Sequence, residues 1–351
     1  MLNRRHFIAG VTALAGAGAA RRQASAQNAP PVTRVAFGSC AHQDKPQPIW
    51  DAVLAYKPEV YVFAGDNVYG DVSSADMTEL KQAYAKARTI DGYMRVRRET
   101  PVVLATWDDH DYGSNDDGAA FAHRRLAQQI FADFWELPAD DPRRRRDGIH
   151  HAWATGAPGQ RLQIILLDTR FFRSALRPTD ARGQPGKERY VPDADPAKTV
   201  LGDEQWRWLE VQLGEPADLR LIVTSIQVLA DGHGWERWGN LPLERQRLYD
   251  LIAACRASGV VFLSGDRHFG GIYRRSDGLA YPLHEITSSG INMVYWSVRE
   301  PDAARLGAPY AAANFGTIDI DWWAGEVALS VRAIGGEPVR RVTLSLASLR
   351  G

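Results

Sequence analysis

The chain of 351 residues contains only two cysteines, Cys40 and Cys255. Two cysteines cannot build the network of disulfides that stabilises small secreted domains, so a chain of this length must depend on a hydrophobic core. A single Cys40–Cys255 disulfide is the alternative in an oxidising compartment. Cys255 lies in an amphipathic helical pattern typical of a small buried side chain, whereas Cys40 ends an apolar run. We therefore favour Cys40 as a metal ligand.

The sequence also has no excess of charge, with 42 basic and 42 acidic side chains. Residues 1–26 hold four arginines and no acid, so the remainder has 38 basic and 42 acidic side chains. This weakly acidic balance argues against binding to nucleic acid or to an anionic membrane surface. Walker-type glycine loops, G-x-S-x-G elbows and the Rossmann fingerprint are all missing. The sequence therefore gives no sign of a P-loop nucleotide site, a serine esterase or a dinucleotide site.

Long apolar runs are missing too, and the one near the N-terminus is short. Arg4 and Arg5 precede a weakly hydrophobic stretch, Phe7–Ala20, which is followed by an Ala24–Ala26 cleavage pattern. A membrane anchor is the alternative, but this stretch is too short and too poor in leucine to span a bilayer. The pattern predicts a twin-arginine (Tat) signal peptide over 1–26, read by the Tat export machinery. We expect a periplasmic or secreted protein whose mature chain has no membrane span.

The rest of the chain predicts one large α/β domain. After a linker at 27–33, predicted strands and helices alternate as far as about residue 266, and beyond 270 the pattern is nearly all strand. Two packed sheets with helices outside them, a four-layer αββα sandwich, satisfy both halves. We therefore expect a signal peptide at 1–26 and a single domain at 34–351. The predicted helices are 47–57, 76–98, 119–137, 202–213 and 242–258.

Six short apolar runs end on residues that can bind a metal or act beside one. In open α/β sheets, ligands bind beyond the carboxyl ends of the strands. Polar residues repeated at this position therefore predict one shared, metal-centred site. The runs are 34–40, 60–70, 102–111, 164–170, 221–227 and 260–268, and they end on Cys40, Asp66 with Tyr69, Asp109 with His110, Asp168, Gln227, and Asp266 with His268.

The segment Gly65–Gly70 suggests which metal binds. Asp66 follows a glycine at a strand end, where a carboxylate can bridge two cations because the backbone is uncluttered. Tyr69 can turn back to the same metal. A tyrosinate ligand selects a hard, highly charged ion, since only a strong Lewis acid deprotonates a phenol near neutral pH. With cysteine and histidine nearby, this pattern favours ferric iron.

Two further segments complete the predicted site. In Trp107–Asp111, three carboxylates surround one histidine, an arrangement that is costly unless a cation neutralises it. Asp109 is our predicted ligand of a second metal, and His110 is placed to protonate a leaving oxygen. In Ser264–His268, Asp266 and His268 share one side of an extended chain, so both can reach the metals.

Several other polar residues have weaker signals. Arg267 is a candidate for contact with an anionic substrate. Asp168, Arg170 and Gln227 follow strands, so they either contact the site or cap turns. The remaining candidates are Asn115 and Asp116 as further oxygen ligands, and His233 as a pocket residue.

These motifs, in this order, resemble the metallophosphoesterase superfamily and, within it, the alkaline phosphatase D family. General members of the superfamily begin with Asp-x-His, have a second aspartate where Tyr69 stands and end in Gly-His-x-His. This chain departs from all three in the way that the alkaline phosphatase D branch does, and it looks like a short form without the added N-terminal β domain. The resemblance rests on Gly38–Cys40, Gly65–Gly70, Thr106–Asp111, Leu167–Arg170 and Ser264–His268.

The resemblance implies an αββα fold and hydrolysis of phosphomonoesters or phosphodiesters, either small molecules or polymers. It implies one ferric ion, Fe(3+), held by Cys40, Asp66, Tyr69 and His268. It also implies a divalent ion, with calcium, Ca(2+), as the expected identity, which shares Asp66 and is held by Asp109 and Asp266.

The mechanism that the resemblance implies is attack on phosphorus by a metal-activated hydroxide. His110 would assist the leaving alkoxide, and Arg170 or Arg267 would hold the nonbridging oxygens. Two other classes of protein stay open at this point. One is an iron-containing redox protein, and the other is a non-catalytic, metal-stabilised phosphate-binding protein.

Overall fold

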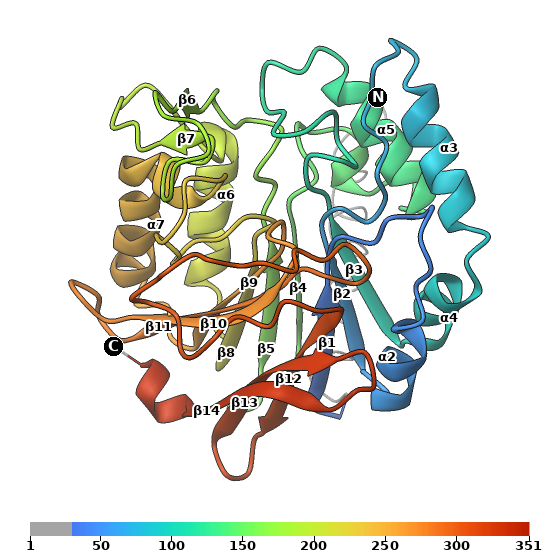
Figure 1. Ribbon diagram of the computed structural model, residues 1–351. Helices are drawn as coiled ribbons and strands as arrows, with labels where there is room; N and C mark the ends of the chain where they lie inside the picture. Colours follow the sequence, from blue (N-terminus) through green and yellow to red (C-terminus); the bar gives the residue numbers. More distant parts are fainter. Residues whose placement is uncertain (1–29, 351) are drawn as a thin grey trace, which may run out of the picture.

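Two six-stranded sheets pack face to face, and helices cover the outer face of each (Figure 1). The computed structural model describes residues 30–350, so the predicted signal peptide lies outside the described residues. The four layers confirm the predicted αββα sandwich. β4 and β5 pair as an antiparallel hairpin.

The first sheet combines the first three strands, β1, β2 and β3, with the last three, β12, β13 and β14. Its order is β14-β13-β12-β1-β2-β3; β1, β2 and β3 are parallel, and β12, β13 and β14 run antiparallel to their neighbours. The carboxyl ends of β1, β2 and β3 therefore meet at one edge of the sheet. The strands are β1 Arg34–Gly38, β2 Val60–Ala64, β3 Val102–Thr106, β12 Asn314–Asp321, β13 Glu326–Ala333 and β14 Pro338–Ser345.

The second sheet has the order β10-β11-β9-β8-β5-β4, with a parallel centre formed by β11, β9, β8 and β5. A parallel bridge between Ser39 and Ser289 joins the two sheets just beyond the ends of β1 and β11. The carboxyl ends of both parallel sets thus meet at one place. The strands are β4 His151–Thr155, β5 Leu162–Leu166, β8 Leu219–Val223, β9 Val260–Ser264, β10 Gly270–Arg275 and β11 Leu283–Ser288.

Helices form the two outer layers, four over the first sheet and two over the second (Figure 1). Among residues 30–350, no helix is long and apolar enough to cross a membrane. Two short strands, β6 and β7, pair within the surface excursion at 174–200. The helices are α2 Trp50–Tyr56, α3 Thr78–Ala87, α4 Asp91–Glu99, α5 Arg124–Phe134, α6 Gly202–Gly214 and α7 Pro242–Ala254; β6 is Arg177–Pro178 and β7 is Tyr190–Val191.

The observed helices are shorter than the predicted ones at several ends, and α7, for example, ends at Ala254 where 258 was predicted. The predicted helices at 76–98 and 119–137 differ most from those observed. The predicted helix at 76–98 is divided into α3 and α4, because the Thr89 hydroxyl donates to the carbonyl of Lys86 and closes the end of α3. The predicted helix at 119–137 begins only at Arg124. The reason is tertiary, since the Ala119 N–H donates to the carbonyl of Arg173 and holds the preceding turn outside the helix.

β1 and β2, in the first sheet, bury both faces, which explains their apolar sequences. Along β1, Val35 and Phe37 point into the core between the sheets, whereas Ala36 points to the core beneath α2–α5. In β2, Val62 likewise points into the core between the sheets, and Tyr61 points to the core beneath the helices. This alternation follows the two-residue period of a strand. Two apolar cores therefore fix the sheet from both sides, and the strand ends have a rigid base.

The contact between β1 and β12 supplies a test of this packing. Gly316 pairs with Phe37, and a Cβ at position 316 would lie 2.0 Å from Phe37 Cε1. We expect Gly316→Ala to lower the free energy of unfolding by about 1–3 kcal/mol through overpacking. Denaturant unfolding measures this, with Gly214→Ala as the control, because nothing lies within 4 Å of a Cβ there. Equal stability of Gly316→Ala and the parent would contradict the tight packing of Phe37.

Candidate metal centre

Four predicted metal ligands have left-handed backbone conformations. The φ angles are 63° at Cys40, 49° at Asp66, 66° at Asp266 and 57° at His268. A residue with a Cβ is disfavoured in this region, and each such residue costs on the order of 1–3 kcal/mol. The fold imposes this conformation directly after three strands, β1, β2 and β9. Strain of this kind is concentrated at functional sites, and here it sets the direction of the ligand side chains.

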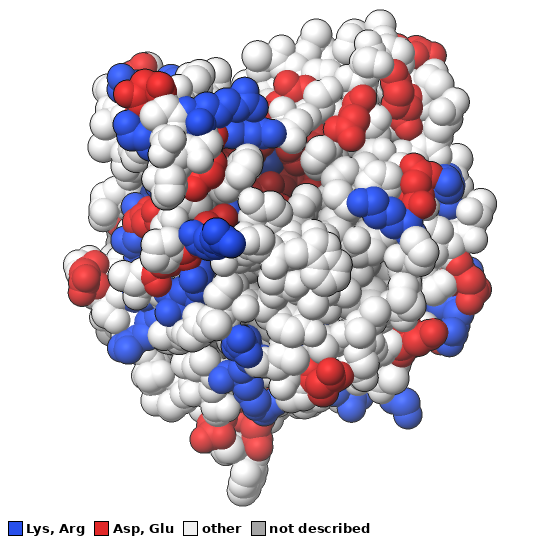
Figure 2. Space-filling view, viewed as in Figure 1, with Lys and Arg blue, Asp and Glu red and all other residues white. Residues whose placement is uncertain are grey.

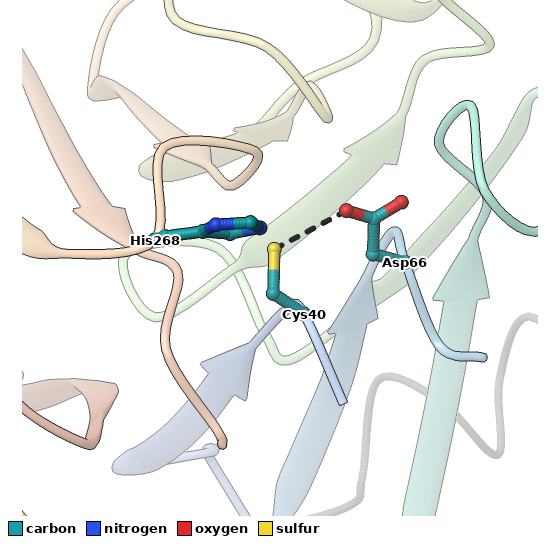
Figure 3. Close-up of side chains that lie close together, drawn as sticks. All are labelled: Cys40, Asp66 and His268. Atoms are coloured by element: carbon teal, nitrogen blue, oxygen red, sulfur yellow. Dashed lines mark hydrogen bonds between the residues drawn. The ribbon is translucent and has the colours of Figure 1, made fainter. Parts of the chain in front are cut away.

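The first ligand cluster contains Cys40, Asp66, Tyr69 and His268. Figure 3 shows Cys40 and Asp66 at the ends of neighbouring strands, with the His268 ring beside them. Cys40 Sγ lies 3.3 Å from Asp66 Oδ2, and the Tyr69 hydroxyl donates to the same oxygen at 3.3 Å. Tyr69 Oη is also 3.1 Å from His268 Nε2. The structure thus brings the four predicted iron ligands together.

A second cluster adjoins the first and shares a residue with it. One ligand atom each from Asp66, Asp109 and His110 lies within 4.8 Å of the others, and the same is true of Asp108, Asp109 and Asp266. Asp66 belongs to both clusters. All six predicted ligands therefore lie in one continuous group around the shared Asp66.

The electrostatics of the group fit cations. Burial, followed by the charges of Cys40 and Asp109, raises the pKa of Asp66 well above its ordinary value. Burial and the charge of Asp108 do the same for the pKa of Asp266, and burial raises the pKa of the Cys40 thiol to about 12. Each of these groups must lose its proton to act as a metal ligand, and a cation at the site favours that loss.

Unpartnered oxygens in the group support the same conclusion. Asp108 Oδ2 and Asp109 Oδ1 are buried and have no hydrogen-bond partner among residues 30–350. Burial opposes ionisation of Asp109, but Arg170 and His110 outweigh it and hold its pKa below the ordinary value. An ionised, buried carboxylate with a free oxygen is a suitable ligand for a metal ion. The residues present therefore fit the metals that the sequence implies.

A cavity of about 230 Å³ opens directly onto this group. Figure 2 shows the hollow in this face of the molecule, with acidic atoms in red on its floor. Three predicted ligands, Asp109, Asp266 and His268, line the cavity together with His110. These three are therefore accessible to a small molecule, unlike the ligands of a closed structural site.

Comparison with known proteins bears on this geometry. The family model described as PhoD-like phosphatase matches residues 35–305. The chain belongs to the PhoD-like phosphatase family. This confirms the resemblance to the alkaline phosphatase D family that its motifs suggested.

Individual relatives are more distant. The chain is 25% identical over 239 residues to alkaline phosphatase D of Bacillus subtilis (strain 168), a match that covers 62% of this chain and 40% of that protein. The chain thus spans less than half the length of this relative. Among solved structures, that of PhoD has a TM-score of 0.71 at 18% identity, over 91% of this chain and 70% of the other. Purple acid phosphatase PPD1 from yellow lupin (Lupinus luteus) seeds has a TM-score of 0.60 at 10% identity, over 91% and 55%. These two structures show the shared fold.

In this PhoD-like chain, His110 lines the cavity beside the ligand clusters. Its Nδ1 is 2.6 Å from Asp71 Oδ1, and its ring centroid lies 4.3 Å from that of Tyr69. Burial lowers the pKa of His110, but Asp109, Asp66 and Asp71 outweigh burial and raise it to about 11. Sequence reasoning missed Asp71. Its signal was its position just beyond Gly70, at the end of the Tyr69 motif.

Two other residues that sequence reasoning missed hold the ligands in place. The Asp111 carboxylate accepts the backbone N–H groups of Asp66, Asn67 and Asp108 at 3.2, 3.1 and 2.6 Å, so it ties the ends of β2 and β3 together. Ser289 accepts the N–H of His268 at 2.7 Å and lies 3.1 Å from Cys40 Sγ. Groups that orient metal ligands in this way commonly affect metal affinity by about 10–100-fold.

Arg170 lies beneath the site, away from the expected substrate position. Its side chain is fully buried; Nε donates to Asp108 at 2.5 Å, and Nη1 donates to Glu236 at 2.5 Å. A guanidinium that two carboxylates hold in the interior is not free to contact a phosphate in the cavity. The structure therefore gives Arg170 a supporting position and leaves Arg267, which lines the cavity, as the predicted arginine that can contact a substrate.

The residues with weaker signals also have assigned positions. Asp168 caps a turn, because it accepts the backbone N–H groups of Ile149, Arg170 and Phe171. Gln227 is buried and bonds His233 at 2.9 Å, so neither residue lines the cavity.

Asn115 and Asp116 both line the cavity. Asp116 also forms an ion pair with Arg189, a cavity residue from the irregular stretch at 174–200 that no sequence pattern marked.

The shared position of Asp66 leads to a prediction about metal content. Asp66→Asn removes the negative charge common to both ligand clusters, so we expect both metal ions to be lost or bound at least tenfold more weakly. Elemental analysis of the purified protein after dialysis measures the metal per chain. Asp91→Asn, in α4 and away from the site, is the control and should match the parent. Full metal content in Asp66→Asn would contradict the bridging position.

Proposed function

We propose that this protein is a metal-dependent phosphoric ester hydrolase, a phosphomonoesterase or phosphodiesterase. The observation that carries the proposal is a pair of ligand clusters that share Asp66 and open onto a cavity beside His110. Membership of the PhoD-like phosphatase family supports the same activity. The substrate is a phosphate ester of a small molecule or of a polymer end that can enter the cavity.

The chemistry of the donors supports a pair of different metals. Cys40, Asp66, Tyr69 and His268 would hold Fe(3+), since thiolate and phenolate donors suit a strongly Lewis-acidic ion. Asp66, Asp109 and Asp266 would hold a divalent ion, and an all-carboxylate set suits Ca(2+). When bound, the two cations would supply Lewis-acid activation of water and stabilisation of phosphoryl charge.

The side chains around the cavity would have separate roles in proton transfer, phosphate orientation and support of the site. His110 would hold a proton for the leaving oxygen, and Asp71 at Nδ1 would fix the orientation of the ring so that Nε2 serves as the donor. Arg267, on the cavity wall, would orient nonbridging oxygens of the phosphate. Arg170 would act indirectly, by holding Asp108 and Glu236 in position beneath the cavity.

The alternatives have less support. An iron redox protein needs no second, carboxylate-rich cluster beside the iron ligands, and a non-catalytic binding protein needs no protonated histidine held over the cavity. The twin-arginine pattern at Arg4 and Arg5 supports export of the folded enzyme to the periplasm or medium. We accordingly propose a signal peptide at 1–26 and a single catalytic domain at 34–351.

Hydrolysis of bis-p-nitrophenyl phosphate and of p-nitrophenyl phosphate tests the activity directly. With iron and calcium supplied, we expect the purified protein to turn over at least one of the two esters. Asp66→Asn should lose this activity by about a thousandfold or more, because it disturbs both metals. Asp91→Asn is again the control. Failure of the metal-loaded parent to hydrolyse either ester would overturn the proposal and favour a binding or redox role.

The role of His110 has its own prediction. His110→Ala should lower kcat by about a hundredfold or more, because general acid catalysis contributes about 10²–10⁴-fold. Metal content, measured by elemental analysis, should match the parent. Asp71→Asn, which keeps an oxygen acceptor for Nδ1, should lose far less activity than Asp71→Ala. Full activity of His110→Ala on an ester with an alkyl leaving group would refute this assignment.

A further inference from the structure

The cavity wall above the metal ligands has an unusual composition. It contains two aromatic side chains, Trp235 and Tyr295, and the other wall residues are all polar or charged: Asn115, Asp116, Arg189, Glu236 and Arg267. Among the described residues, no aliphatic side chain lines the cavity. A site for an acyl chain or a lipid tail would need aliphatic walls. The apolar surface offered to a substrate is therefore aromatic.

Trp235 is held in a fixed orientation. The guanidinium carbons of Arg189 and Arg267 lie 5.4 and 5.5 Å from the centre of its ring. The backbone N–H of Trp235 donates to His233 Nδ1 at 3.2 Å, and the Gly234 carbonyl accepts the backbone N–H of Arg189 at 3.0 Å, so the backbone that holds the ring is fixed as well. The ring is therefore positioned before any ligand arrives, which lowers the entropic cost of stacking against it.

The two arginines are already neutralised by partners. Arg189 is paired with Asp116, and Arg267 is paired with Glu300. Neither guanidinium offers a free positive charge for a second phosphate group on the substrate. Their contact with Trp235 holds its ring in place, and Arg267 also lines the cavity. Recognition of the organic part of the substrate is therefore left to the aromatic rings.

Tyr295 supplies a second ring at the same cavity. It is 45% exposed, and its N–H donates to the carbonyl of the metal-ligand residue His268 at 2.8 Å. The position of this ring is thus tied to that of a metal ligand. Because the Tyr295 side chain is exposed and lines the cavity, it is available for stacking against a substrate.

We propose that the cavity selects phosphate esters whose organic part is a planar ring, with a small nucleotide as the biological form, stacked on Trp235 and Tyr295. The proposal rests on the proposed hydrolase function and names its substrate class. The cavity of about 230 Å³ lies below the usual range of about 300–1,000 Å³ for ligand sites, which favours a small phosphate ester. Equal numbers of basic and acidic residues argue for a free nucleotide over a polynucleotide.

Calorimetric binding of two ligands tests this selection. Thymidine 5′-monophosphate and glycerol 3-phosphate have the same charged group, and only the first has a ring. With the metals supplied, and in the His110→Ala background that slows turnover, we expect thymidine 5′-monophosphate to bind at least about tenfold more tightly. Adding Trp235→Ala should remove about 10–100-fold of its affinity, since stacking of one base contributes about this much. Affinity for glycerol 3-phosphate should stay within about twofold.

Trp235→Phe is the matched control, because it keeps a ring and should retain most of the preference. Tyr295→Ala should lower the same ratio. Equal affinity for the two ligands, or an equal loss of both in Trp235→Ala, would overturn the selection. Ring-dependent binding without hydrolysis of either p-nitrophenyl ester would sink only the hydrolase function, and hydrolysis without ring preference would sink only this inference.

Discussion

Buried negative charge is the constraint on which the rest of this structure depends. Asp66, Asp108 and Asp109 are buried, and Asp266 lies beside them on the cavity, so their mutual repulsion would be prohibitive without compensation. The protein supplies part of it through the guanidinium of Arg170 and through His110. This compensation is incomplete among residues 30–350, because Asp108 Oδ2 and Asp109 Oδ1 are buried and accept no hydrogen bond. The remaining charge is what makes the site suitable for metal ions.

The same charges connect the floor of the site to its wall. Arg170 joins Asp108 to Glu236, and Arg173 lies 2.8 Å from the other oxygen of Glu236. Glu236 directly follows Trp235, the ring on the cavity wall. Because a buried ion pair is costly to break, the loop that holds Trp235 is fixed relative to the metal ligands. Phosphate chemistry and ring recognition would then be properties of one rigid network, which accounts for the supporting role we propose for Arg170.

The two-sheet fold makes this concentration of charge possible. Only an arrangement in which the carboxyl ends of two parallel sets meet can bring ligands from β1, β2, β3 and β9 to one point. The apolar cores on both sides of the first sheet hold those ends rigidly enough to keep Cys40 and His268 in left-handed backbone conformations. Stability stored in the cores thus offsets strain at the site.

The sequence by itself determined the layers and marked the candidate ligands. A buried strand needs an apolar run, and its end is the first place where a polar residue is tolerated, so Asp66, Asp109 and Asp266 were marked by position alone. Only the tertiary structure decided that Arg170 lies beneath the site and Arg267 on its wall, because both follow strands and look alike in sequence. It also decided the positions of Ser289, Trp235 and Tyr295. These residues lie in irregular loops, where no periodicity reveals direction, and their roles come from contacts with residues distant in the chain.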